Sequence, residues 1–495
     1  MQIQRRVLAW IYRVKGIEMF TQEKFDGVEN FFLNGNYAPV SEEHVATDME
    51  VIGTVPDDIE GYFMRIGPNP VYCADPEAYH IFDGDGMVHQ VEFTNGKATY
   101  RNRFVDTEGL RKEREKGGWI WKGMNATMVD MVSGTPPPEG GAMKDLVNTA
   151  MVYHANKFYG LMEGGTPHEM TLPDLDTVGP NNYEGRLKHP FTAHPKVDVN
   201  TGDMMTFGYS PMPPFCSYSV VNGEGELVHS TPISLPKGVM MHDCAITDNH
   251  TIFLDLPITF DFERAMNGQN MLAWEPENGS RIGVIPRMGS DEDVKWFDID
   301  TCMVFHVANA WEEGDEVVLI ACRSNRTDVA NATENASDDD MDMTEQLARM
   351  HEWRLNMATG EVKSRAIDGV NYGEFPRIND TLAGLKTRYT YVAGIDEHQK
   401  GTPFTSEMKY DGETGALQVH PFGEGLKGGE AIFAPRVNAT SEDDGYVIVF
   451  VHDDINQKSE CRVIDAQNFE AEPVARIMIP HRVPFGFHAG WVAKD

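Results

Sequence analysis

The segment HQVEFTNGKATYRNRF, residues 89–104, predicts the fold class of the chain. Apolar and polar side chains alternate on both sides of Asn95-Gly96, and this dipeptide favours the tight turn of a β-hairpin. Short β-branched and aromatic runs between turn residues recur along the chain. Further examples are AMVYHANKFYGLM (150–162), TIFLDLPITF (251–260), EVVLIACR (316–323) and DGYVIVFVHD (444–453). We therefore predict an all-β protein.

We expect few long helices, because 46 Gly and 28 Pro are spread through the 495 residues. One stretch, MDMTEQLARMHEW (341–353), predicts a helix after a polar acidic loop at residues 325–340. No linker or strict repeat divides the chain. Many strands over about 450 residues, without alternating helices, favour a closed or radially repeated β architecture. Seven units of about 70 residues suit a propeller, although periodicity alone does not select seven.

The composition excludes several function classes. The chain carries 42 Lys and Arg against 77 Asp and Glu, a formal net charge of −35. Nucleic-acid backbones and anionic lipid surfaces are bound through basic patches, so we expect neither a nucleic-acid partner nor a polybasic membrane contact. Six cysteines lie far apart with no CxxC motif, which predicts reduced thiols in a cytoplasmic protein.

The N-terminal segment, residues 1–29, is predicted to be a leader outside the working fold. Its apolar run VLAWIY has six residues, too few for a membrane span or for the core of a secretory signal. Basic residues flank this run, so a short amphipathic helix on a membrane surface is the alternative to a frayed leader. No other apolar run approaches the ~20 residues of a membrane helix.

Four of the 17 histidines lie beside apolar or aromatic residues at expected strand ends. They are His194 in FTAHPKVD, His242 in GVMMHDCAIT, His306 in CMVFHVANAW and His488 in PFGFHAGW. Histidine is a common metal ligand, but hydrogen-bonded core histidines are the common alternative. Separations of 48, 64 and 182 residues leave both interpretations open.

Several long motifs in a fixed order resemble those of the carotenoid cleavage oxygenases. They are FMRIGPNP, YHIFDGDGMVH, FTAHPKVDVNTG, MMHDCAIT, SRIGVIPR, FHVANAWEEGDEVV, EWRLNMATGEV, EFPRIN and GGEAIFAPR. The resemblance spans about residues 30–491, nearly the whole chain. It implies one β-propeller dioxygenase domain over residues 30–495, with seven blades and with helical and loop insertions capping one face. It also implies one non-haem Fe(II) per chain on the axis, with His194, His242, His306 and His488 as its ligands.

The same resemblance implies three carboxylates behind the histidines: Glu163 in GLMEGG, Glu374 in GEFPRI and Glu430 in GGEAIF. A ligand histidine needs an acceptor that orients its second ring nitrogen. An Fe(II) ion with four imidazole ligands keeps open positions where O₂ can bind. Judged by residue type alone, each glutamate is also compatible with a solvated carboxylate in a turn.

The activity that the resemblance implies is cleavage of a conjugated C=C bond by Fe(II) and O₂, which yields two carbonyl products. The substrate would be a carotenoid or apocarotenoid, an apolar polyene. A stilbene or phenylpropenoid is the alternative, because WEPENGSRIGVIPR also resembles the lignostilbene branch. A non-catalytic carotenoid-binding propeller is a third interpretation. Its signature would be loss of a ligand histidine, and all four are present.

One position distinguishes the substrate classes. The lignostilbene branch holds a phenol hydroxyl with a tyrosine and a lysine. Phe104, a substrate-tunnel candidate, stands where that tyrosine would be, and Lys144 lies near the place of the lysine. A polyene substrate also predicts apolar surface at the tunnel mouth and peripheral membrane contact. Residues 212–218 and 256–262 are the candidates for this surface, with core strands as the alternative.

Overall fold

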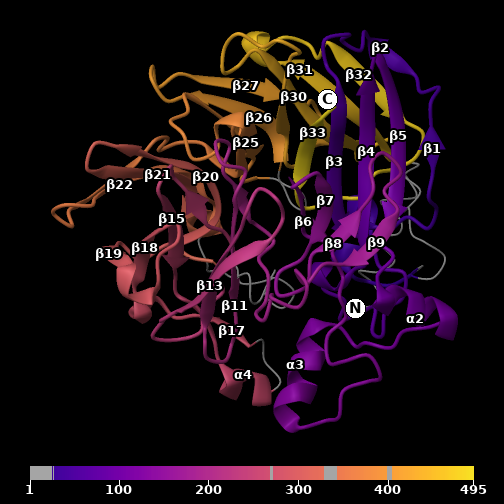
Figure 1. Ribbon diagram of the computed structural model, residues 1–495. Coiled ribbons are helices and arrows are strands. Elements are labelled where there is room, and N and C mark those ends of the chain that lie inside the picture. Colours follow the sequence, from indigo (N-terminus) through magenta and orange to yellow (C-terminus); the bar gives the residue numbers. More distant parts are fainter. Residues whose placement is uncertain (1–24, 26, 268–270, 328–342, 399–403, 495) are drawn as a thin grey trace.

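The computed structural model describes residues 25, 27–267, 271–327, 343–398 and 404–494. Within them, seven antiparallel sheets have four to six strands each, and two further strands form a separate hairpin. The sheets follow one another around a closed ring and are numbered here as blades 1–7 (Figure 1). The predicted all-β, seven-bladed propeller is confirmed.

Blades 2–6 are built from strands in chain order. Blade 2 holds β6 (Ala150–His154), β7 (Lys157–Leu161), β8 (His168–Met170) and β9 (Thr177–Pro180). Blade 3 holds β10 (Lys196–Val197), β11 (Met204–Tyr209), β12 (Cys216–Val221) and β13 (Leu227–Ile233). Blade 4 holds β14 (Ala245–Ile246), β15 (His250–Asp255), β18 (Ser280–Pro286) and β19 (Lys295–Ile299), interrupted by the hairpin of β16 (Ile258–Phe260) and β17 (Leu272–Trp274). Blade 5 holds β20 (Met303–Glu313), β21 (Glu316–Ser324), β22 (Arg349–Asn356) and β23 (Val362–Ala366). Blade 6 holds β24 (Tyr372–Arg377), β25 (Tyr389–Ile395), β26 (Phe404–Asp411) and β27 (Leu417–Pro421).

Blades 1 and 7 each combine strands from both parts of the chain, and this closes the ring. Blade 1 is ordered β1 (Val45–Ala46), β5 (Lys97–Phe104), β4 (Gly86–Thr94), β3 (Gly61–Pro68) and β33 (Ala489–Ala493). Blade 7 is ordered β2 (Val51–Gly53), β32 (Ala475–Ile479), β31 (Lys458–Asp465), β30 (Gly445–Asp453) and β28 (Leu426–Lys427), with β29 (Ile432–Pro435) also on β30. The pairings of β33 with β3 and of β2 with β32 therefore join early and late segments by backbone hydrogen bonds.

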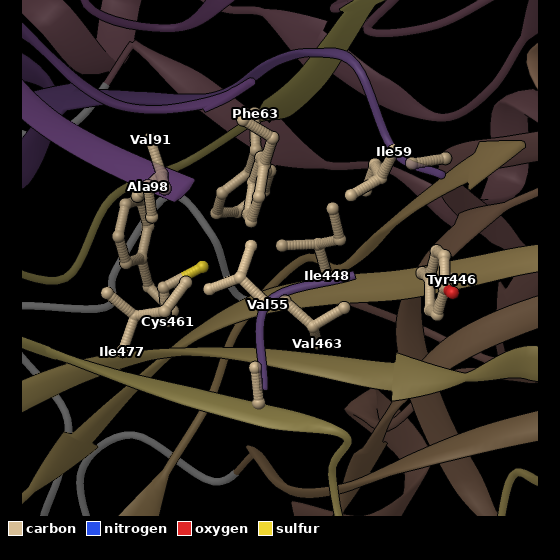
Figure 2. Packing of buried hydrophobic residues seen from close by; sticks show 14 of the residues in the cluster. Val55, Ile59, Phe63, Val91, Ala98, Tyr446, Ile448, Cys461, Val463 and Ile477 are labelled. Atoms are coloured by element: carbon tan, nitrogen blue, oxygen red, sulfur yellow. The ribbon is translucent and has the colours of Figure 1, made fainter. Parts of the chain in front are cut away.

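An apolar cluster packs this closure (Figure 2). Phe63 and Val91 of blade 1 are fully buried, as are Ile448 and Val463 of blade 7. The rings of Phe63 and Phe450 lie 4.9 Å apart between their centroids. Burying one such side chain contributes about 1.5–3 kcal/mol, so the cluster fixes the two blades against each other.

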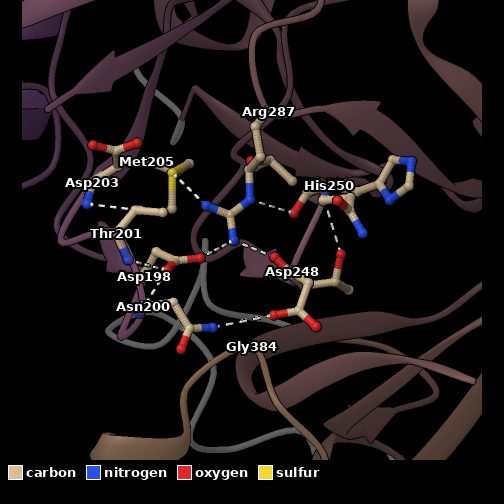
Figure 3. Close-up of polar contacts among 12 residues, drawn as sticks. Asp198, Asn200, Thr201, Asp203, Met205, Asp248, His250, Arg287 and Gly384 are labelled. Atoms are coloured by element: carbon tan, nitrogen blue, oxygen red, sulfur yellow. Dashed lines mark hydrogen bonds and ion pairs between the residues drawn. The ribbon is translucent and has the colours of Figure 1, made fainter.

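Blades 3 and 4 are joined by polar contacts centred on Arg287 (Figure 3). Its guanidinium lies 2.7 Å from the Asp198 carboxylate and donates to the backbone carbonyl oxygens of Thr247 and His250. Asp198 follows β10 of blade 3, and Thr247 follows β14 of blade 4. Because charge-assisted hydrogen bonds are the strong ones, Arg287 fixes the ends of two inner strands relative to each other.

Helical insertions gather on one side of the ring (Figure 1). They are α2 (Glu108–Lys116) and α3 (Met124–Ser133) between β5 and β6, and α4 (Phe262–Met266) between β16 and β17, with α3 in contact with α4. Helix α2 begins after Thr107, whose hydroxyl accepts the Leu110 N–H, and ends at Gly117 with φ +72°. Among the described residues, no helix combines the length and apolarity that crossing a membrane requires. Single 3₁₀ turns are Phe31–Leu33, Gly35–Tyr37, Ile81–Asp83, Pro276–Asn278, Asp291–Asp293, Met343–Gln346, Asp380–Leu382 and Ala466–Asn468.

The predicted helix at residues 341–353 is wrong. Met343–Gln346 form one 3₁₀ turn, and the chain from Arg349 onward is strand β22. This strand pairs with β21 and β23 and buries Met350 and Trp353. Pairing on both sides outweighs the local helix preference of the segment. Residues 328–342, with most of the predicted acidic loop, lie outside the described residues, and so does the leader except residues 25 and 27–29.

Glu407 on β26 is a buried carboxyl without a partner. Glu407 is 0% exposed, and neither of its side-chain oxygens has a hydrogen-bond partner among the described residues. Burial and then the charge of Glu430 hold the pKa of Glu407 well above its usual 4.5. The folded protein therefore keeps a proton that the unfolded chain releases above about pH 4.5, so this carboxyl lowers stability as the pH rises.

Replacing this carboxyl by an amide should remove that pH dependence. We expect Glu407→Gln to raise the free energy of unfolding by about 1–3 kcal/mol near pH 8, because the amide does not titrate. The gain should disappear below about pH 4, where the carboxyl is protonated in both the folded and the unfolded state. Denaturant titrations at the two pH values measure this difference. An equal gain at both would contradict the explanation.

Candidate metal centre

Each blade brings one of the predicted site residues to the axis of the ring. They are His488 before β33 in blade 1, Glu163 after β7 in blade 2, His194 before β10 in blade 3, His242 before β14 in blade 4, His306 in β20 of blade 5, Glu374 in β24 of blade 6 and Glu430 before β29 in blade 7. The fold therefore gathers residues that lie up to several hundred positions apart in the sequence.

Local irregularities of the inner strands aim two of these side chains. The pairing register of β20 with β21 shifts across His306, and that of β24 with β25 shifts just after Glu374. Such bulges re-aim side chains and often lie beside functional sites. Phe375 has φ +55°, a backbone conformation that an aromatic residue adopts only when its surroundings impose it. Its N–H donates to the Glu374 carboxylate at 2.6 Å, which holds that conformation.

The four histidines converge on one point. The Nε2 atom of His242 lies 3.1 Å from the Nε2 atoms of both His194 and His306. With His488 included, one ligand atom from each side chain lies within 4.8 Å of the others. Two adjacent ligands of an ion bound at about 2.1 Å lie about 3 Å apart, so this spacing suits a single metal ion.

Three of the four histidines have a glutamate behind them. The pairs are His242 Nδ1 with Glu163, His306 Nδ1 with Glu374 at 2.5 Å, and His488 Nδ1 with Glu430 at 3.2 and 3.3 Å from its two oxygens. An ionised carboxylate only accepts hydrogen bonds, so each Nδ1 donates its proton and each Nε2 turns a lone pair toward the centre. Lone pairs 3.1 Å apart repel each other unless a cation lies between them. The donor set therefore fits a divalent metal ion.

Burial and neighbouring charge set the protonation of these groups. Burial, assisted by the other three histidines, holds the pKa of His194 well below its ordinary value, so this imidazole is neutral. Burial also lowers the pKa of His488, and Glu430 opposes it only in part. For His306, burial acts to lower the pKa, but the Glu374 carboxylate, together with Asp243 and Glu430, raises it overall. Burial acts to raise the pKa of Glu430, but His488 and then Arg377 lower it overall, which favours the carboxylate.

Four further residues support this centre and were not singled out from the sequence. The Tyr209 hydroxyl donates to Glu163, and the Arg377 guanidinium lies 3.6 Å from Glu430. Asp243, next to a histidine in the chain, accepts the N–H of Val307 at 2.8 Å and pairs with Lys196 at 2.8 Å. Tyr209, Lys196, Arg377 and Asp243 lie in or near the motifs quoted above, but their contacts arise only where different blades meet.

The structure places Phe104 away from the histidines. It ends β5, is 6% exposed, and packs against Met87 and Leu110. The guanidinium of Arg114 lies 5.2 Å from its ring centroid. Among the residues described, Phe104 is absent from the lining of the cavity that adjoins the histidines. Its predicted contact with substrate stays a prediction.

Known proteins resemble this chain in sequence and in architecture. The sequence profile of the family described as Retinal pigment epithelial membrane protein matches residues 37–493. The chain belongs to this family, the carotenoid cleavage oxygenases. It is 39% identical to the carotenoid 9,10(9',10')-cleavage dioxygenase 1 of Arabidopsis thaliana over 94% of this chain and 90% of that protein. It is 33% identical to a carotenoid cleavage oxygenase of Mycobacterium tuberculosis over 94% and 97% of the two chains.

A solved structure agrees with this assignment. The lignostilbene dioxygenase of Pseudomonas brassicacearum superposes with a TM-score of 0.85 at 27% identity, over 94% of this chain and 99% of that one. Relatives that span most of the chain are named dioxygenases and oxygenases. This family member is accordingly an enzyme of the dioxygenase class.

Proposed function

We propose that this oxygenase binds one Fe(II) per chain through His194, His242, His306 and His488. It uses O₂ to cleave a conjugated C=C bond of a carotenoid or apocarotenoid into two carbonyl products. The observation that carries the proposal is the convergence of four imidazole nitrogens at the axis of a propeller of this family. Fe(II) bound there would supply the redox chemistry that activates O₂ for insertion into the alkene.

The protein's own residues have three tasks in this proposal. The imidazoles hold the ion, and because they carry no charge they leave it doubly positive. The three glutamates keep the Nδ1 protons in place and fix the ring orientations. Aromatic side chains beside the centre exclude water from the reacting alkene. The ring of Phe375 stacks on His306 with centroids 4.9 Å apart, and the ring of Phe305 lies 5.6 Å from His242.

The aromatic side of the centre suits an apolar polyene. Ring contacts lead outward from Phe375 to Phe404 at 5.5 Å, from Phe404 to Phe485 at 6.1 Å, and from Phe485 to Tyr37 at 5.0 Å. Tyr37 in turn contacts Phe31, which is 53% exposed. A conjugated chain gains both apolar burial and ring contacts along such a surface. These packed rings form an apolar flank that extends from the histidines toward the protein surface.

A phenolic stilbene is the alternative substrate, and the similarity to the lignostilbene dioxygenase is the observation in its favour. Two residues weigh against it. Phe104 has no hydroxyl to offer to a phenol. The Lys144 ammonium, 8% exposed, is already bound between Asp85 and Glu113, the latter at 2.6 Å. A site selects a substrate hydroxyl through a free polar partner, and neither residue provides one.

A competition between the two substrate classes tests the proposed function. Iron-loaded enzyme is given an apocarotenal together with a 4-hydroxystilbene, and the aldehydes formed are identified. We expect a higher kcat/KM for the apocarotenal in the wild type and in Phe104→Leu, which keeps the position apolar. Phe104→Tyr is the matched variant that adds only a hydroxyl. A preference for the hydroxystilbene that persists in Phe104→Leu would establish the alternative.

We further propose a cytoplasmic location with peripheral membrane contact near α3 and α4. All six cysteines are free thiols, which supports a reducing compartment. Met131 on α3 is 53% exposed, and Met266 on α4 is 65% exposed. Met212, in the loop between β11 and β12, is 59% exposed. The predicted stretch at residues 256–262 contributes less, because Leu256 and Ile258 are buried.

Vesicle sedimentation tests this membrane contact. The wild type should sediment with vesicles of neutral lipid, and Met131→Asp combined with Met266→Asp should weaken that binding, because each aspartate must be desolvated at the lipid surface. Met288→Asp is the matched control, since Met288 is 56% exposed on blade 4. Equal binding of all three proteins would contradict the contact.

A further inference from the structure

A cavity lined by both apolar and charged residues connects the histidines with solvent. A cavity of about 290 Å³ is lined by His194, His306 and His488. Its walls come from residues that follow the histidines along the inner strands, such as 307–310 in β20 and 489–492 in β33. Its far end is lined by Tyr153 and Asp380. Tyr153 is 43% exposed, and the side chain of Asp380 is 53% exposed. We name this cavity the axial shaft.

Carboxylates are placed along the axial shaft. Asp380 stands at its outer end, and Asp243 and Glu430 lie close to the histidines. Lys196 pairs with Asp243 at 2.8 Å, while Arg377 lies 2.6 Å from Asp380 and 3.6 Å from Glu430. Three carboxylates thus face two cations, and the excess charge is negative. Carboxylate oxygens are suitable partners for a divalent cation that exchanges its water ligands in steps.

The aromatic side of the centre, whose rings do not line the shaft, does not suit an ion. Phe305 and Phe375 adjoin the histidines there, and further aromatic rings follow Phe375 outward. A hydrated dication would lose its water ligands against rings that offer no anionic oxygen, and such desolvation is costly. The two sides of the centre therefore differ in the kind of molecule they admit.

We propose that the metal ion enters and leaves the four-histidine centre through the axial shaft, on the side away from the apolar substrate. The inference rests on the proposed function, in which this centre holds a metal. Asp380 attracts the hydrated ion at the opening, and the negative charges of Asp243 and Glu430 draw it onward to the imidazoles. Metal exchange then needs no displacement of a polyene from the aromatic side.

Rates of metal release and uptake test this route. Iron-loaded protein is mixed with excess chelator under nitrogen, release is timed, and the metal-free protein is then reloaded with Fe(II) or Co(II). Ala383→Trp places a large ring in the shaft lining and should slow both rates by about tenfold or more. Tyr153→Ala opens the outer end and should speed both. Asp380→Asn should slow both by about two- to fivefold through weaker electrostatic attraction.

The equilibrium affinity for metal distinguishes a residue that lies on the entry route from a residue that binds the metal. A residue that acts only on the path changes release and uptake by the same factor, so the Kd should stay within about twofold of the wild type in all three variants. Glu108→Gln is the matched charge control, because Glu108 is a 74% exposed carboxylate on α2, away from the shaft. It should leave both rates unchanged. A saturating apocarotenal without O₂ should also leave them unchanged.

The outcomes distinguish this inference from the function on which it rests. Normal rates in both Ala383→Trp and Tyr153→Ala would overturn the route, and so would a block of metal exchange by the apocarotenal. In either case the protein still binds metal, and the proposed function stands. A wild-type protein that binds no metal at all would overturn the proposed function, and the route with it.

Discussion

His306→Ala is expected to lose most of its metal and nearly all of its activity while the propeller stays folded. The Nε2 of His306 is one of the converging donors, 3.1 Å from that of His242. Its loss should cost more than the ~10–100-fold that is typical for partners behind a ligand. The fold should survive because β20 keeps its backbone pairing with β21, and the ring closure between blades 1 and 7 lies elsewhere.

A second buried histidine provides the control for this experiment. His154 lies at the end of inner strand β6, is 3% exposed, and bonds the Gly202 carbonyl oxygen at 2.8 Å through Nε2. His154→Ala removes a buried imidazole of the same size without touching the centre. It should keep its metal, although it will lose some stability. Metal analysis and thermal unfolding measure both effects, and full metal occupancy in His306→Ala would refute its assignment as a ligand.

Glu430→Gln should lower metal affinity or activity by about 10–100-fold. The two oxygens of Glu430 serve two donors: both lie within 3.3 Å of His488 Nδ1, and one also accepts the N–H of Ala489. An amide has only one accepting oxygen, so its NH₂ group would face one of these donors. The side chain is 3% exposed, and water cannot readily repair the mismatch. His488 would then lose the partner that fixes its proton and its orientation.

Glu407→Gln is the matched control for Glu430→Gln. Both replace a buried carboxyl in neighbouring blades, and Glu430 contributes to the raised pKa of Glu407. The side-chain oxygens of Glu407 make no hydrogen bond to any described residue, so its amide variant should keep the metal affinity of the wild type. Titration of metal-free protein with Fe(II) under nitrogen compares the three proteins. Equal affinities of Glu430→Gln and wild type would mean that Glu430 does not support a ligand.

Local sequence patterns predict the all-β class, but they do not predict which residues meet at the site. Alternating strands around turns such as Asn95-Gly96 are local features, so the all-β class could be predicted from the residues themselves. The helix predicted at residues 341–353 failed because pairing of β22 with strands on both sides is non-local. The count of seven blades came from the family resemblance, since strand spacing alone does not fix it.

The site depends on ring closure, and this limits what spacing can predict. His306 and His488 are 182 residues apart, and they meet only because β33 returns to pair with β3. The motifs identified the histidines and glutamates through resemblance. They did not reveal that Arg377 lies beside Glu430 or that Tyr209 donates to Glu163. These contacts arise from strand bulges and from the faces of separate blades, which single-sequence patterns do not encode.

Anomalous diffraction at the iron absorption edge is the sharpest test for a single metal ion held by the four imidazoles. Crystals of the iron-loaded protein would be measured on both sides of the edge. We predict one anomalous peak per chain, between the Nε2 atoms of His194, His242, His306 and His488. A peak at any other place, or none at the histidines in protein that contains iron, would contradict the account.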